Sequence, residues 1–355
     1  MYCGCAAPPP AWLKDRYGVD IDLEVAETID ELQIKPLPSE LRGQASTHIA
    51  QAAKALGYDW EPQLKFLKPA RAARFDCGAK CMLGCRCGAK WSAAEYVDQA
   101  VEAGCQLHTG ALVESVLIED GTVRGVSGRI GGKPFTAQAE TVVLAAGGIG
   151  TPRILYSTKV PGLQQAGQGL TMDITVMVYG TIQDQGIGKE PPMTWSWENL
   201  DEGYMLSTLI DPWLLYPLIN ALKGPKYALT WPRWKNTLGV MIKLKDDISG
   251  GVFPKGKISK PMTNHDRPRM QAAEALCRRI LIEAGARPDT IFTTPLRGTH
   301  PSGTVRIGIL VDQNLQTEVP GLYVCDASVF PEALGRPTVL TIIGLGKRLA
   351  KFLTV

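Results

Sequence analysis

Hydrophobic and polar positions change their period several times along the chain, and each change predicts a different kind of element. Residues 141–146 are nearly all apolar, which is typical of a strand buried on both faces of a sheet. Residues 92–104 and 268–285 repeat their apolar positions at helical spacing. Residues 171–179 and 238–244 alternate, which predicts an antiparallel sheet between about 160 and 290.

The stretch near the C-terminus combines a strand, a loop and a helix. A short apolar strand in residues 321–325 ends at Asp326, and residues 338–346 open a helix. A helix whose N-terminus points back at such a loop can hold an anionic cofactor. His300 lies upstream and is the titratable side chain of this stretch that ordinarily changes charge near neutral pH. A strand–helix unit of any α/β protein with a surface histidine would show the same spacing.

Two groups of motifs are more specific than this spacing. The first group is HPSGT at 300–304, VCDASVFP at 324–331 and TVLTIIGLGKRLA at 338–350. The second is TVVLAAGGIGTPRIL at 141–155. The first group resembles the C-terminal signature, and the second the strand–AGG–TP–helix segment, of the glucose–methanol–choline (GMC) family of FAD-dependent oxidoreductases. The resemblance runs with gaps over residues 1–355. It implies an α/β fold in which an incomplete FAD-binding, Rossmann-like domain carries an antiparallel-sheet α+β substrate domain.

The resemblance divides the chain into four parts. Residues 1–70 would form a helical N-terminal segment, 71–160 a flavin-domain part with a Cys-rich loop, 161–285 a substrate or cap domain, and 286–355 the C-terminal flavin-domain part. Family members begin with a strand, a GxGxxG turn and a helix that hold the FAD pyrophosphate, whereas no such pattern occurs before residue 100. We therefore expect a truncated N-terminus, a separate chain that carries this unit, or lost flavin binding, and we favour truncation. The chain alone should bind FAD weakly or not at all.

The resemblance also implies roles for individual residues. His300 would be the catalytic base that removes the hydroxyl proton of an alcohol. The second catalytic His or Asn of the family aligns with Pro337, which can neither take a proton nor orient a hydroxyl. The implied FAD contacts are the backbone of Val113 at adenine, Ala146 and Gly147 at a turn where Gly147 and Gly148 allow close approach, Asp326 and Ala327 at the ribityl–pyrophosphate region, and Thr338 and Val339 at the pyrimidine ring.

A cysteine-rich loop is a candidate metal site. Its four thiols are flanked by Lys80, Arg86 and Lys90, cations that favour thiolates able to hold an iron–sulfur cluster or zinc. The spacing C-x3-C-x3-C-x-C matches neither a common ferredoxin run nor a zinc ribbon. Reduced or paired cysteines in a compact loop would explain the pattern equally well. The candidate ligands are Cys77, Cys81, Cys85 and Cys87.

Charge and the distribution of apolar residues narrow the possible partners. The chain has 38 basic and 35 acidic residues without a dominant basic run, which argues against nucleic acid. Polar residues and prolines interrupt the apolar region 206–222, so we expect no membrane span, and no secretory signal opens the chain. We expect a cytoplasmic protein. Five of the eight tryptophans lie between 160 and 290, where they could line a pocket, pack on each other, or place the protein on a membrane surface.

The function predicted from these features is FAD-dependent oxidation of the CH–OH group of an apolar alcohol, with His300 as the base. Two alternatives stay open. One is a partner-dependent electron-transfer subunit that uses the cysteine cluster, and the other is a truncated chain that binds no flavin. No motif indicates the electron acceptor.

Overall fold

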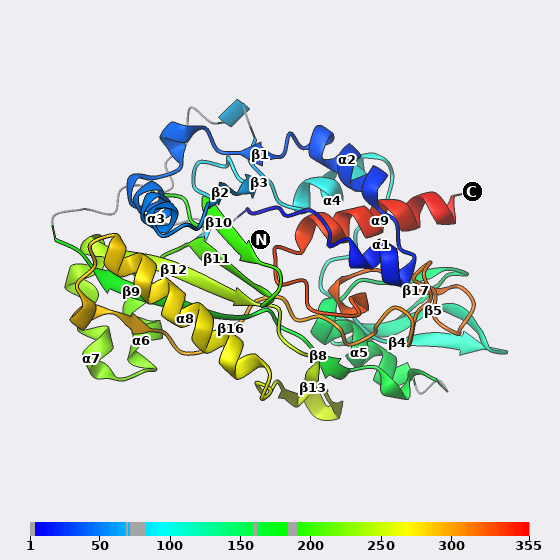
Figure 1. The fold of residues 1–355 in the computed structure, drawn as a ribbon. Helices are drawn as coiled ribbons and strands as arrows, with labels where there is room; N and C mark the ends of the chain where they lie inside the picture. Colours follow the sequence, from blue (N-terminus) through cyan, green and yellow to red (C-terminus); the bar gives the residue numbers. More distant parts are fainter. Residues whose placement is uncertain (1–3, 69, 72–82, 159–161, 184–189, 355) are drawn as a thin grey trace.

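The computed structural model describes residues 4–68, 70–71, 83–158, 162–183 and 190–354. Most elements pack around two hydrophobic cores (Figure 1). Residues 4–68 contribute to both cores, because α1 (Trp12–Tyr17) and α2 (Asp22–Glu31) join the first and α3 (Gln44–Ala55) joins the second. The fold is a mixed α/β arrangement with antiparallel sheets, as predicted.

A large antiparallel sheet forms one half of the molecule. Its strand order is β15 (Phe292–Thr293), β9 (Ile174–Thr181), β12 (Thr237–Leu244), β11 (Tyr204–Thr208), β10 (Trp195–Asn199) and β2 (Glu61–Pro62), and β16 (Arg297–Gly298) also pairs with β9. Alternate residues of β9 and β12 pack against α3 and α8 (Asp266–Glu283), while the residues between them face the opposite side of the sheet. The period-two pattern of the sequence thus separates a helix-covered face from a face that lines a cavity.

Helix α8 begins two residues before the predicted start at 268. Thr263 and Asp266 explain this, because each accepts a hydrogen bond at 3.0 Å from the backbone N–H of the other. Such a reciprocal pair satisfies N–H groups that the first turn leaves open and therefore favours an earlier start.

The other half contains a short parallel strand pair. β7 (Val142–Leu144) pairs with β17 (Leu322–Val324), and the helices α5 (Gly147–Thr158) and α9 (Val339–Leu353) follow the two strands. An antiparallel sheet of β4 (Ala111–Glu119), β5 (Thr122–Ile130) and β6 (Lys133–Gln138) lies beside them, with β4 against α5. Figure 1 shows α1 and α2 alongside the red α9, and Lys351 joins α9 to Glu24 of α2 through an Nζ–Oε1 distance of 3.0 Å.

The prediction that residues 141–146 are buried on both faces was wrong for one face. Val142 and Leu144 are buried, whereas Val143 is 41% exposed and Ala145 and Ala146 are also exposed. The reason is that the core covers only the side of β7 that carries Val142 and Leu144, and in the described part of the chain β7 pairs with β17 alone.

The remaining elements are short apart from α4 (Ala94–Glu102). β8 (Gln168–Leu170), β13 (Ser249–Val252) and β14 (Ile258–Ser259) form a three-stranded sheet, and β1 (Lys35–Pro36) pairs with β3 (Leu64–Lys65). The helices α6 (Leu215–Ala221) and α7 (Pro225–Ala228) lie beyond the end of the large sheet, on the side of the molecule away from α9 (Figure 1).

Candidate active site

A cavity of about 500 Å³ lies where the two halves meet. Its walls come from the inner faces of β9 and β12, from α6, from the segment 297–300 and from the start of α9. The apolar lining includes Met177, Met193, Leu209, Leu215, Ile219 and Met241, together with Pro337 and Val339. The polar side chains that line it are Thr175, Lys243, Arg297, Thr299, His300 and Thr338. A volume of this size and a lining that combines apolar side chains with several polar groups are usual for small-molecule sites.

His300 is held by a buried carboxylate. Its Nδ1 lies 2.6 Å from Oδ2 of Asp173, and Oδ1 of Asp173 accepts a hydrogen bond of 2.8 Å from the backbone N–H of Gly335. The Asp173 side chain is 2% exposed and that of His300 is 24% exposed. A carboxylate at Nδ1 favours the tautomer with the proton on that nitrogen, which leaves the Nε2 lone pair to accept a proton.

Burial is the largest effect on His300 and lowers its pKa below the ordinary value of 6.5. The nearby Lys243 ammonium lowers the pKa further, and the Asp173 carboxylate opposes both effects. Since the net shift is downward, the imidazole is neutral at neutral pH, which is the form that a general base requires.

Lys243 is a buried cation on a strand that is otherwise largely apolar. It projects from β12 to the cavity side, and its Nζ donates a hydrogen bond of 2.9 Å to Oγ1 of Thr299. Buried lysines are uncommon unless they are paired or functional. Sequence reasoning missed this residue, although a lysine within the run 238–244 was a visible signal.

Arg297 forms a second charged group at the cavity. Its Nη1 and Nη2 donate to the two carboxylate oxygens of Asp211 at 2.8 and 2.6 Å, and the hydroxyl of Tyr179 donates to Oδ2 of Asp211 at 2.6 Å. Burial, as the largest effect, and the Asp211 charge hold the pKa of Tyr179 well above its usual value, so its hydroxyl stays protonated. The carboxylate thus neutralises Arg297, and the bidentate geometry fixes the guanidinium in place.

The structure brings several of the predicted FAD contacts together. Oδ2 of Asp326 accepts hydrogen bonds from the Gly147 backbone at 2.8 Å and from the Thr151 hydroxyl at 2.5 Å. Oδ1 accepts one of 2.7 Å from the Ser328 backbone. The end of β7 is thereby joined to the end of β17, with Ala146 and Ala327 next to the two bonded residues. The carboxylate of Asp326 therefore accepts hydrogen bonds from backbone N–H groups of the protein itself. The sequence did not indicate this structural role.

Other predicted contacts lie on either side of this junction. Thr338 and Val339 line the cavity together with His300. Val113 is half-buried on β4, which packs against α5. Pro337, at the position where a second His or Asn was expected, also lines the cavity.

The two adjacent glycines of the AGG motif differ in what surrounds them. Gly147 has φ +77° and open space where a Cβ would stand, so a ligand can approach it closely. A Cβ on Gly148 would lie 2.1 Å from the carbonyl oxygen of Pro301. The expectation that Gly148 makes room for the cofactor is therefore corrected. A glycine is needed at this position because the loop that carries His300 approaches its backbone closely.

The start of α9 fits the flavin end of FAD. The N-cap residue Thr338 makes no side-chain hydrogen bond to this 15-residue helix, so its side chain leaves the first backbone N–H groups beside the cavity uncapped. Such N–H groups and the helix dipole stabilise negative charge, as carried by a reduced flavin. When bound, FAD would supply hydride acceptance, and Thr338, Val339 and Gly147 would hold it if the contacts implied by the sequence resemblance are right.

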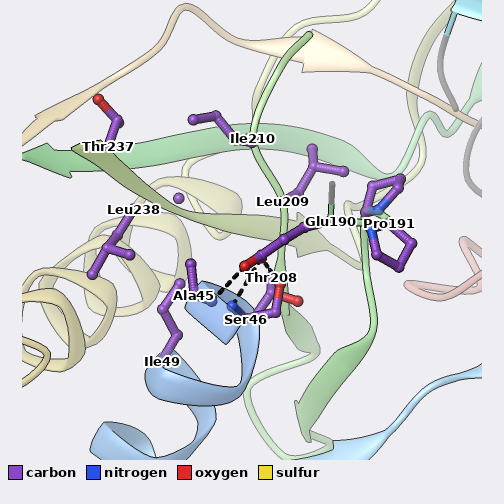
Figure 2. A pocket seen from close by; sticks show the side chains of 12 residues that line it. Ala45, Ser46, Ile49, Glu190, Pro191, Thr208, Leu209, Ile210, Thr237 and Leu238 are labelled. Carbon is purple, nitrogen blue, oxygen red and sulfur yellow. Dashed lines mark hydrogen bonds between the residues drawn. The ribbon is translucent and has the colours of Figure 1, made fainter. Parts of the chain in front are cut away.

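A much smaller hollow of about 20 Å³ lies at the start of α3. Figure 2 shows Glu190 directed at the first turn of this helix, where Oε2 accepts hydrogen bonds from the backbone and the hydroxyl of Ser46 at 3.0 and 2.9 Å. The backbone N–H of Ala45 donates to Oε1. Glu190 thus caps α3 although it lies 144 residues after Ser46 in the chain. The hollow has room for little more than a water molecule.

The predicted metal ligands fall partly outside the described residues. Cys77 and Cys81 belong to the part of the chain that the structure does not describe. The Sγ atoms of Cys85 and Cys87 are 3.6 Å apart, too far for a disulfide bond. Among the residues that the structure describes, no three His, Cys, Asp or Glu side chains are grouped so as to hold a metal ion. A cluster at these cysteines stays a prediction.

Gly147 and Asp326 lie just beyond the carboxyl ends of the parallel strands β7 and β17, which is where open α/β sheets bind their ligands. The chain belongs to the GMC oxidoreductase family, because the models of that family match residues 17–174 and 254–346. This confirms the resemblance seen in the motifs. Family membership makes the chain an oxidoreductase by class and implies FAD as its cofactor.

Two relatives and one solved structure illustrate the similarity. An uncharacterized protein of Methanocaldococcus jannaschii is 29% identical over 94% of this chain and 81% of its own length. A long-chain-alcohol oxidase of Arabidopsis thaliana is 24% identical over 75% of this chain and 44% of its own length, so the chain spans less than half of that relative. The crystal structure of pyridoxine 4-oxidase from Mesorbium loti has a similar fold, with a TM-score of 0.65 and 14% identity over 90% of this chain and 71% of that one.

The described residues include no helix with the length and apolar character needed to cross a membrane.

Proposed function

We propose that this chain forms the alcohol-oxidising site of an FAD-dependent oxidoreductase, and that its substrate is an apolar, chain-like alcohol. The observation that carries the proposal is the cavity itself. A neutral histidine oriented by Asp173 lines it together with other polar side chains, and methionine, leucine and isoleucine side chains supply most of the apolar lining. The matched Arabidopsis relative is named a long-chain-alcohol oxidase, which supports the same substrate class.

In the proposed oxidation, each residue of the site has a separate role. Nε2 of His300 accepts the proton of the substrate hydroxyl, and Asp173 stabilises the imidazolium that forms. Lys243 disfavours protonation of His300 before the alcohol binds, so the base is ready at neutral pH. When bound, FAD would supply the acceptor for the hydride of the carbinol carbon. Pro337 contributes no proton transfer, so His300 is the base on which the step depends.

The side of β7 left uncovered supports a further part of the proposal. Val143, Ala145 and Ala146 form an apolar strip next to Gly147. We propose that a dinucleotide-binding unit, on this or another chain, covers this strip and holds the FAD pyrophosphate. Exposed apolar strand residues beside an open ligand position are what such a unit would bury.

The test compares 1-alkanols of increasing length in the presence of added FAD and a dye as electron acceptor. Each added CH2 should raise kcat/KM about 4-fold until the cavity is full, because burial of one CH2 contributes about 0.8 kcal/mol. His300→Ala should lower kcat about 100-fold or more, as loss of a general base does. His108→Ala, at an exposed position, is the matched control and should keep full activity. A preference for pyridoxine over long alkanols would contradict the apolar substrate, and an active His300→Ala variant would remove this base.

A further inference from the structure

Residues 212–236 form a surface, here termed the cap segment, that carries exposed apolar side chains on two short helices and the turns beside them. It comprises α6, α7 and the 3-10 helix η5 (Trp231–Asn236), and α6 contacts both of the other two. The exposed large apolar residues of the cap segment are Trp213, Leu214, Leu218, Leu222, Leu229 and Trp231. Apolar side chains gathered in this way mark an interaction surface more often than singly scattered ones do.

The two ends of the cap segment are in contact through two of its exposed apolar residues. The ring centroids of Trp213 and Trp231 are 5.0 Å apart. Tyr216 of α6 is buried and accepts a hydrogen bond of 3.1 Å from the Thr230 hydroxyl. The surface therefore has a defined shape, with two indole rings in contact at one edge.

Helix α6 presents three different faces. Tyr216 and Asn220 point into the protein, Leu215 and Ile219 line the cavity described above, and Leu218 and the neighbouring Leu214 and Leu222 are exposed. Leu218 is 66% and Leu222 80% exposed. One layer of helix thus separates the cavity from the outer surface of the cap segment.

The charge of the cap segment is one-sided. It contains Lys223, Lys226, Arg233 and Lys235 and no acidic residue, although acids nearly balance bases over the whole chain. All four basic residues are exposed. Lys and Arg around exposed Trp and Leu are typical of surfaces that bind anionic lipid headgroups while the apolar side chains enter the acyl boundary. The cores of protein–protein interfaces are instead depleted in Lys.

We propose that the cap segment binds the surface of an anionic lipid bilayer, with Leu218 and Leu222 inserted and the basic residues at the headgroups. In this orientation α6 lies between the membrane and the cavity. The inference rests on the exposed surface alone, so it can hold or fail independently of the proposed alcohol oxidation.

The binding experiment is vesicle flotation of the full chain. Vesicles of phosphatidylcholine with about 30% phosphatidylserine should bind the protein, and those of phosphatidylcholine alone should bind it at least about 10-fold more weakly. Raising the salt concentration should reduce binding, because basic residues near an anionic surface are screened within a Debye length. Equal binding to both kinds of vesicle, or none to either, would overturn the proposal.

Matched variants separate the contribution of the apolar side chains to vesicle binding from that of the basic side chains. Leu218→Asp and Leu222→Asp together should reduce binding about 10-fold or more, whereas Leu107→Asp, at another exposed leucine, should not. Lys226→Gln with Lys235→Gln should reduce binding about 30-fold, from about 1 kcal/mol for each lysine.

Brominated lipids give a second readout that does not depend on the amount bound. They should quench tryptophan fluorescence, and this quenching should be lost when Trp213 and Trp231 are both changed to Phe. If the leucine variants bind as the parent does, the surface is not the membrane site. If they instead abolish a dimer seen by sedimentation while vesicles do not bind, the surface joins two copies of the chain and the proposal is wrong.

Discussion

Gly148→Ala tests whether the AGG motif exists to let two backbone segments approach. Gly148 lies in the first turn of α5, and a Cβ placed there would be 2.1 Å from the Pro301 carbonyl oxygen, 2.5 Å from its carbon and 2.8 Å from the Ser302 nitrogen. All three are backbone atoms, so no side-chain rotation relieves the contact. The oxygen would have to move by roughly 1.3 Å to reach an ordinary van der Waals distance.

The expected change in the free energy of unfolding combines two opposing contributions. Replacing a helical glycine by alanine stabilises a helix by about 1 kcal/mol. Overpacking against rigid neighbours costs about 1–3 kcal/mol, and contact of backbone with backbone exceeds the usual range because neither side can give way. We therefore expect a net loss of about 2 kcal/mol in the free energy of unfolding, a roughly 30-fold change in the folded-to-unfolded ratio. Displacing the His300 loop by about 1 Å should also lower kcat about 100-fold.

The assay is urea unfolding followed by circular dichroism, with Gly346→Ala as the matched control. Gly346 is also helical, and no atom lies within 4 Å of the position that a Cβ would take there, so only the helix stabilisation remains. The control should gain about 1 kcal/mol. Gly344→Ala should fall between them, since its Cβ would lie 3.1 Å from the side-chain ends of Ile21 and Val25. If Gly148→Ala is as stable as Gly346→Ala, the close approach does not constrain the site.

Three further predictions concern charge and cofactor. Because Lys243 lowers the pKa of His300, Lys243→Met should raise that pKa. Activity is lost as pH falls through this pKa, so the acid limb of the kcat/KM profile should move to higher pH. An acid limb that stays in place or moves to lower pH would contradict this. Asp211→Asn leaves Arg297 without its charged partner and should reduce the free energy of unfolding by about 3 kcal/mol, whereas Asp289→Asn at an exposed pair should leave the unfolding midpoint nearly unchanged. The chain purified alone should show little visible flavin absorbance, because we expect weak pyrophosphate binding without a GxGxxG helix; stoichiometric FAD would refute that expectation.

The sequence predicted those parts of the site that consist of contiguous motifs. HPSGT, the strand ending at Asp326 and the helix after Thr338 each combine residue types that few other folds require in that order. The alternation in residues 171–179 and 238–244 likewise predicted strands, since a period of two follows directly from strand geometry.

The remaining parts depend on contacts between distant residues. Asp173 is 127 residues from His300 and occupies a left-handed conformation, φ +45°, that no local pattern indicates. Val143 looked buried because composition cannot show whether a neighbouring element covers the second face of a strand. Residues 206–222, which include α6, formed an interrupted apolar run in the sequence, and only the fold separates the exposed positions of α6 from those that line the cavity.

The pairing of β7 with β17 joins residues 142–144 to residues 322–324. During synthesis β7 must therefore wait for about 180 further residues, which take roughly 10 to 40 s at ordinary translation rates. Its apolar edge is open to aggregation throughout that interval. Until β17 emerges, Asp326 cannot receive the Gly147 N–H, and the turn that should admit a flavin has no fixed shape. This turn thus takes its final form only after nearly the whole chain has been synthesised.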